Sequence, residues 1–142
     1  MTATRQASVV RLALRYFLLV FLAGFVLGPV RVLLVEPAVG RRAAVLFEIP
    51  LMIAVILYTA HRMVRGPAAH CSGGQCIAWG GLAAGMVIAA DWVVGLLRGM
   101  PFREILTHGD GVAATAYYSS VLIVGLAPLV WRWRRFGREP EL

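Results

Sequence analysis

Three charged side chains and one phenol lie inside long hydrophobic stretches of this sequence. Arg31 is in the first stretch, Glu48 in the second, Asp91 in the third and Tyr117 in the fourth. A charge at the centre of a bilayer costs at least about 2.5–3.5 kcal/mol. A chain that carries three such charges is therefore expected to pair them inside a helix bundle. The sequence predicts that Arg31, Glu48, Asp91 and Tyr117 form one polar cluster.

Two interpretations of this predicted cluster are open. It is either an ion-pair network that only fixes the packing of the helices, or a working site that binds a cationic ligand, carries protons or holds a lipid headgroup. One arginine can balance only one of the two carboxylates, so one negative charge stays uncompensated. That charge requires a second arginine or a carboxylate that keeps its proton.

Two cysteines and a histidine form the second candidate site. His70, Cys71 and Cys76 lie between the second and third hydrophobic stretches, and Cys and His are ligands for zinc and copper. The C-x4-C spacing is wider than the C-x2-C of most zinc sites. We therefore expect ordinary reduced thiols, with these three residues as weak metal candidates. His108, in a later connection, is expected to be solvated.

No cofactor is expected. The chain has no phosphate-binding loop, dinucleotide-binding fingerprint or nucleophile elbow. Its three histidines lie at the ends of the hydrophobic stretches or between them, where they are badly placed to ligate a haem held between helices.

The length and composition predict a small membrane protein. The chain has 142 residues, of which 60% are hydrophobic, with a mean hydropathy of +0.77. Such values exclude an ordinary water-soluble domain. A helix of about 20 apolar residues crosses a bilayer core of about 30 Å. The four stretches approach or reach that length, and they cover residues 16–35, 43–60, 77–97 and 112–130. The predicted fold is one all-α domain over residues 1–142, an antiparallel up-down bundle of four transmembrane helices.

The connections contain residues that stop or start helices. Pro37 and Gly40 predict a turn between the first two spans. Pro101 predicts a short helix that lies on the membrane surface before the fourth span, with Ile105 on its apolar face. Asp110 is expected to cap the fourth span.

The distribution of arginine predicts the orientation. The net charge is +7 and every cation is Arg. The N-terminal segment, the middle connection and the C-terminal segment hold nine arginines, and the other two connections hold four. The positive-inside rule then places both termini in the cytoplasm of a bacterial inner membrane. Arg132, Arg134 and Arg135 suit anionic lipid headgroups. The arginines do not form a single patch, which argues against nucleic-acid binding.

Small residues share the helix faces that carry two of the buried charges. Gly24 and Gly28 lie on the face of Arg31, and Gly80 and Gly95 lie on the face of Asp91, at spacings that bring side chains together on a helix. Small residues allow close helix–helix packing in membranes. These faces are therefore expected to point toward neighbouring helices.

A resemblance supports this topology. The stretch from Gly28 to Met52 has an Arg at the end of the first span, a Pro-x-x-Gly turn and a Glu-x-Pro at the start of the second span. It resembles a group of small bacterial four-span inner-membrane proteins. The resemblance implies the topology and no activity.

Three functions are open at this point. The favoured one is a binding or accessory protein that docks on a larger membrane complex, forms a homo-oligomer or holds a lipid. The alternative is a proton- or cation-coupled transporter or channel that works as an oligomer. The second alternative is an enzyme acting on a lipid or quinone, but the sequence offers no nucleophile with an adjacent base, so we expect no enzyme.

Overall fold

The computed structural model describes residues 2–108 and 111–136, and these residues form helices without strands. The expected cap at Asp110 lies outside the described residues. The elements, in chain order, are α1 (Thr2–Val30), the π-helical turn η1 (Arg31–Val35), α2 (Glu36–Val39), α3 (Arg41–Arg65), α4 (Gly73–Leu97), α5 (Phe102–Thr107) and α6 (Gly111–Phe136).

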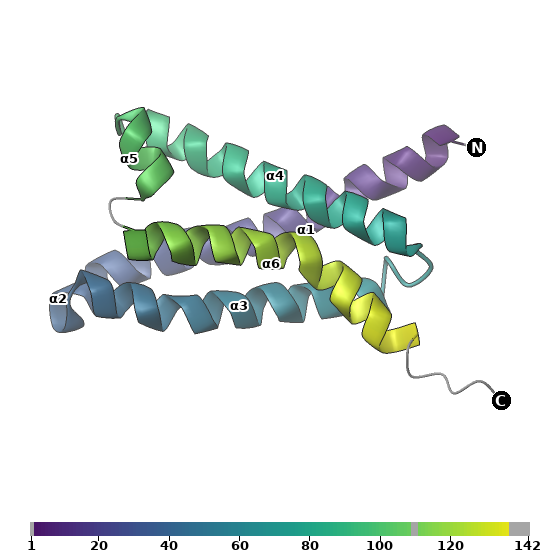
Figure 1. The fold of residues 1–142 in the computed structure, drawn as a ribbon, viewed down its shortest axis with the longest axis horizontal. Helices are drawn as coiled ribbons and strands as arrows, with labels where there is room; N and C mark the ends of the chain where they lie inside the picture. The colour runs from purple at the N-terminus through teal and green to yellow at the C-terminus, as the bar shows by residue number, and fades with distance from the viewer. Residues whose placement is uncertain (1, 109–110, 137–142) are drawn as a thin grey trace.

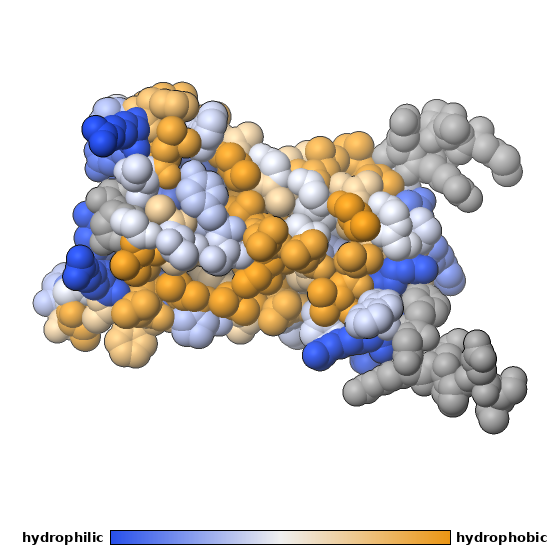
Figure 2. Space-filling model, in the orientation of Figure 1, coloured by the Kyte–Doolittle hydropathy of each residue, from blue (hydrophilic) through white to orange (hydrophobic). Residues whose placement is uncertain are grey.

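Four helical segments are long and apolar enough to cross a membrane, which confirms the predicted multi-pass helical protein. They cover Ser8–Val39, Arg41–Arg65, Gly73–Leu97 and Gly111–Arg135. Only 6–22% of the most apolar part of each segment is buried within the protein. Most apolar side chains therefore face outward, where lipid takes the place of a core. Figure 2 shows the resulting apolar band between two more hydrophilic ends.

The long helices form a ring. α6 packs against α3 and α4, and α1 packs against the same two helices. Among the described helices no contacts join α1 to α6 or α3 to α4, so these pairs lie across the ring from each other. Figure 1 shows α2 and α5 at one end, which we call the α5 end. The start of α1, the end of α6 and residues 66–72 lie at the opposite end, which we call the terminal end.

The first connection differs from the predicted turn. The helix does not stop at Pro37, because Pro37 lies in the first turn of α2, where its missing N–H would have no partner anyway. The chain reverses only at Gly40, which has a φ of +82°. Glycine adopts this conformation without steric cost.

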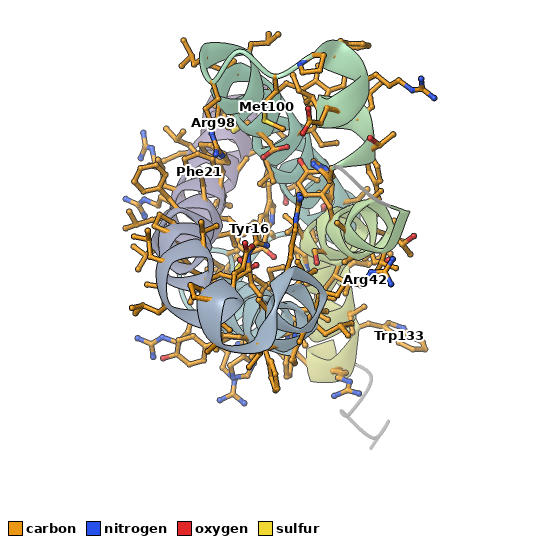
Figure 3. All side chains as sticks on the ribbon, turned by 90° about the vertical axis from the view of Figure 1, so that its left-hand side faces the viewer. Tyr16, Phe21, Arg42, Arg98, Met100 and Trp133 are labelled. Atoms are coloured by element: carbon orange, nitrogen blue, oxygen red, sulfur yellow. The ribbon has the colours of Figure 1, made fainter. Side chains whose placement is uncertain are left out.

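The core is concentrated toward the terminal end. Tyr16 of α1 and Trp79 of α4 are fully buried, with ring centroids 5.3 Å apart in an edge-to-face arrangement. The remaining core residues come from all four long helices; they include Val20, Ile56, Ala60, Ala83, Val124 and Ala127. In Figure 3, which looks along the bundle from the α5 end, Tyr16 lies in the middle of the ring. The α5 end has a smaller buried set, which includes Ala44, Gly95 and Ile105.

α4 and α6 meet at two glycines. A Cβ placed on Gly80 would collide with the backbone oxygen of Gly125 and come within 3.1 Å of Cγ of Pro128. The close approach of the two backbones therefore depends on Gly80 having no side chain.

We expect Gly80→Ala to destabilise the bundle by about 1–3 kcal/mol, because the added methyl group meets backbone that cannot move aside easily. Gly81→Ala is the matched control, since a Cβ on Gly81 meets nothing within 4 Å. Thermal unfolding of both variants in detergent checks this. Equal melting temperatures for the two variants would show that the helices do not approach closely at Gly80.

Candidate functional site

Arg31 lies between two carboxylates at the α5 end. Its Nη1 donates a hydrogen bond of 2.7 Å to Oε2 of Glu48 in α3. Its Nε lies 3.3 Å from Oε1 of Glu36 in α2, an ion pair without good hydrogen-bond geometry. The three side chains are only 19–28% exposed. Removing one partner of a partly buried pair destabilises a protein more than it would on an open surface, because the remaining charge is left uncompensated. We call Arg31, Glu36 and Glu48 the arginine cluster.

A π-helical turn brings Glu36 to Arg31. In a regular α-helix, residues five apart point about 140° away from each other. In η1 the N–H of Glu36 instead bonds the carbonyl oxygen of Arg31, an i→i+5 bond that stacks the two residues. Sequence reasoning missed Glu36 because it assumed that the helix ended in a turn at Pro37.

Asp91 belongs to a second cluster with His108 and Tyr117. Oδ2 of Asp91 lies 3.9 Å from Nε2 of His108. The hydroxyl of Tyr117 lies close to the same carboxylate but outside good hydrogen-bond geometry. The rings of His108 and Tyr117 pack with centroids 4.0 Å apart, and Tyr118 packs against both. We call these four residues the aspartate cluster.

Helix α5 holds His108 in position. Ile105 packs against Gly95 of α4, where a Cβ would come within 2.9 Å of its side chain. The rings of Phe102 and Trp92 pack edge to face at 5.5 Å, and the hydroxyl of Tyr118 donates to the carbonyl of Leu106. Asp91 is expected from the sequence to share its helix face with small residues that admit a neighbouring helix. At Gly95 the neighbour is α5, whose Ile105 packs against the glycine.

His108 has an uncommon backbone conformation. Among the described residues, it is the non-glycine residue with a positive φ, which is +47°. This is the left-handed region, which glycine or asparagine usually occupies at helix ends. Outliers of this kind cluster at functional sites. The conformation ends α5 and places the imidazole against Asp91 and Tyr117. The prediction that His108 is solvated is wrong, since its side chain is only 19% exposed.

Burial decides the charge of His108. It lowers the pKa of the imidazole, and the attraction of Asp91 only partly opposes that effect. His108 is therefore neutral at neutral pH, with a buried Nε2 that has no hydrogen-bond partner in the described residues. The pairing of Asp91 with His108 is consequently a contact between a carboxyl group and a neutral ring at that pH.

The four predicted residues thus form two clusters. The structure joins Arg31 to Glu48, and Asp91 to Tyr117, but records no ion pair between Arg31 and Asp91 in the described residues. Helical spacing placed all four on inward faces, but it does not specify which neighbouring helix each side chain meets.

An open groove is lined by α3 and α6. It has a volume of about 430 Å³ and runs between α3 and α6. Its lining includes Ile49, Ile53, Thr115 and Ser119. The hydroxyl of Thr115 is bonded to the carbonyl of Gly111 in its own helix, so the groove offers few free polar groups.

Comparisons with protein families, with curated proteins and with solved structures find no match to this chain. The resemblance of residues 28–52 to a bacterial four-span group therefore stays a prediction. Three or more His, Cys, Asp or Glu residues do not converge as metal ligands anywhere in the described part of the chain.

The two clusters predict different couplings. In a double-mutant cycle, Arg31→Gln and Glu48→Gln should show a coupling energy of about 1–3 kcal/mol, because the residues share one partly buried contact. The effects of Arg31→Gln and Asp91→Asn on the free energy of unfolding should be additive within about 0.5 kcal/mol. Unfolding of the six proteins in detergent (the unmodified protein, three single variants and two double variants) gives both cycles. Strong coupling of Arg31 to Asp91 would show that the two clusters are one.

His108 predicts a loss of stability in acid. Because its pKa is lowered in the folded protein, the unfolded chain binds more protons below about pH 6.5, the ordinary pKa of histidine. Its contribution is complete above that pH and is lost as the pH falls toward the folded pKa. His108→Asn keeps a residue that tolerates positive φ and should flatten the dependence of the melting temperature on pH in this range. His70→Gln, at an exposed position, should leave the slope unchanged.

Proposed function

We propose that this chain is a small multi-pass membrane protein that works as a binding or accessory protein, and that the aspartate cluster is its ligand site. One observation carries the proposal. Arg31 is already shared by Glu36 and Glu48, whereas the recorded partners of Asp91 are an imidazole and a phenol. A carboxylate whose partners are neutral is suited to receive a positive charge.

The surroundings of Asp91 favour a small organic cation. The carboxylate is 39% exposed, so it is accessible without opening the bundle. The rings of His108 and Tyr117 lie near it, and Tyr118 packs against both of those rings. Aromatic faces attract ammonium groups. The combination of a carboxylate with aromatic rings is the chemistry that recognises an amine.

The thermal stability of the purified protein tests this function. Methylammonium chloride should raise the melting temperature progressively at constant ionic strength, as expected for a ligand that binds only the folded state. Sodium chloride should have a smaller effect. Asp91→Asn should abolish the difference between the two salts, and Glu104→Gln, at an exposed position of α5, should retain it. No difference in the unmodified protein would show that the cluster is only structural.

A proton- or cation-coupled transporter is the second candidate. Two observations support it: the exposed edge of Asp91, and the neutral Nε2 of His108, which has no hydrogen-bond partner among residues 2–108 and 111–136. Proton relays in membranes are built from Asp, Glu and His. Uptake of methylammonium into proteoliposomes that is lost in Asp91→Asn would favour this function over simple binding.

The proposed arrangement in the membrane is an antiparallel up-down bundle in a bacterial inner membrane, with both termini in the cytoplasm. The α5 end then lies at the outer boundary, with α5 on the membrane surface. At the terminal end, Trp133 is 79% exposed and the guanidinium of Arg134 lies 5.7 Å from the ring centre of Trp131. Exposed tryptophan and arginine at one level suit an interface with anionic lipids.

Reporter fusions test this orientation. A reporter that is active only in the periplasm should be silent after Arg138 and active when it is inserted at Gly99, because the positive-inside rule keeps the arginine-rich end in the cytoplasm. The reverse pattern would overturn the orientation and place residues 66–72 outside the cell. A reporter fused after Arg65 provides the internal control, since it should match the fusion after Arg138.

A further inference from the structure

The start of α4 brings the two cysteines together. Ser72 caps the helix: its hydroxyl accepts from the N–H of Gln75, and its own N–H donates to Oε1 of Gln75 at 2.8 Å. Cys71 immediately precedes this capping box and Cys76 immediately follows it. Side chains at these two positions commonly pack against each other across a helix start. The C-x4-C spacing, too wide for a zinc knuckle, thus has a structural explanation.

Both thiols are free, and that of Cys76 is shielded from water. Cys76 is 1% exposed, whereas Cys71 is half-buried and packs against the core cluster. Relative to the N-cap Ser72, Cys71 is the preceding residue and Cys76 is the fourth residue of the helix, the two positions whose side chains meet in a hydrophobic staple. Burial raises the pKa of the Cys71 thiol, and nearby Arg132 only partly reverses that shift. The pair is therefore a neutral dithiol at neutral pH until an ion displaces its protons.

Arg132 supplies a positive charge beside this dithiol. Its Nε lies 3.8 Å from the position that a Cβ on Gly73 would occupy, so the guanidinium packs over the first turn of α4. Its charge acts on both thiols. An anionic complex formed by two thiolates would be stabilised at this position.

We propose that Cys71 and Cys76 form a binding site for a soft monovalent metal ion of the Cu(I) class. Thiolates select soft ions, and a structural zinc site would require four ligands. The described residues offer no converging third His, Cys, Asp or Glu ligand. On binding, each thiol releases one proton and each sulfur donates an electron pair to the ion. The product is a bis-thiolate complex of net charge −1, and no electron is transferred.

Anaerobic titration of the purified, reduced full-length protein with Cu(I), in competition with a chromophoric Cu(I) chelator, tests the site. We expect one ion per chain and release of two protons. The chain has only two cysteines, so Cys71→Ser removes half of the ligands and should abolish competition with the chelator. Because Cys71 is half-buried, this variant should keep its melting temperature, which the same samples report.

Arginine variants test the charge. Arg132→Gln should retain one ion per chain but weaken binding about tenfold or more, the usual effect of losing a group that supports metal ligands. Arg134→Gln is the matched control, because Arg134 is exposed in the same helix. Equal weakening by both variants would show that the charge acts at long range and that Arg132 is not part of the site.

Two results would overturn the proposal. The first is unchanged Cu(I) competition after Cys71→Ser in a folded protein. The second is a Cys71–Cys76 disulfide in protein isolated without reductant, together with no metal retained after reduction. That outcome would identify a redox pair instead. Neither result bears on the aspartate cluster, so this site and the proposed function fail independently.

Discussion

A partly buried charge needs a partner, and the ion pairs of Arg31 decide much of the side-chain arrangement at the α5 end. Two carboxylates reach its guanidinium, one from α3 and one from its own helical segment. The second contact exists because η1 departs from α-helical geometry, and π-turns of this kind recur at functional positions. Once Glu36 and Glu48 share Arg31, the carboxylate of Asp91 has different surroundings. The aspartate cluster therefore has its own chemistry rather than being the remainder of one network.

The two ends of the bundle are packed differently. Toward the terminal end, Tyr16 and Trp79 anchor a core that all four long helices share, and the contact between Gly80 and Gly125 brings α4 and α6 together. The α5 end instead holds the arginine cluster, the aspartate cluster and a groove between α3 and α6. Sites that admit ligands require accessible surface, and regions with few buried contacts are the ones that open most readily. The well-packed half supports a less densely packed half in which binding chemistry is possible.

Short segments between the long helices position both candidate sites. α5 is only six residues long, yet its contacts with Trp92, Gly95 and Tyr118 direct His108 toward Asp91. The capping box at Ser72 acts in the same way on Cys71 and Cys76. In each case a helix end, and not a helix face, brings reactive groups together. Helix ends have free backbone groups and irregular geometry, which is why they form specific local arrangements.

The sequence by itself determined how many helices are long and apolar enough to cross a membrane, and their approximate limits, because the length of a hydrophobic stretch is a local property of the chain. It also placed Arg31, Glu48, Asp91 and Tyr117 on faces with small or polar neighbours. Only the tertiary structure decided their partners, because helical periodicity gives a direction but not the neighbouring helix. Glu36 required a π-turn and His108 a left-handed residue. Such irregular conformations depend on contacts between distant segments, which no local sequence pattern contains.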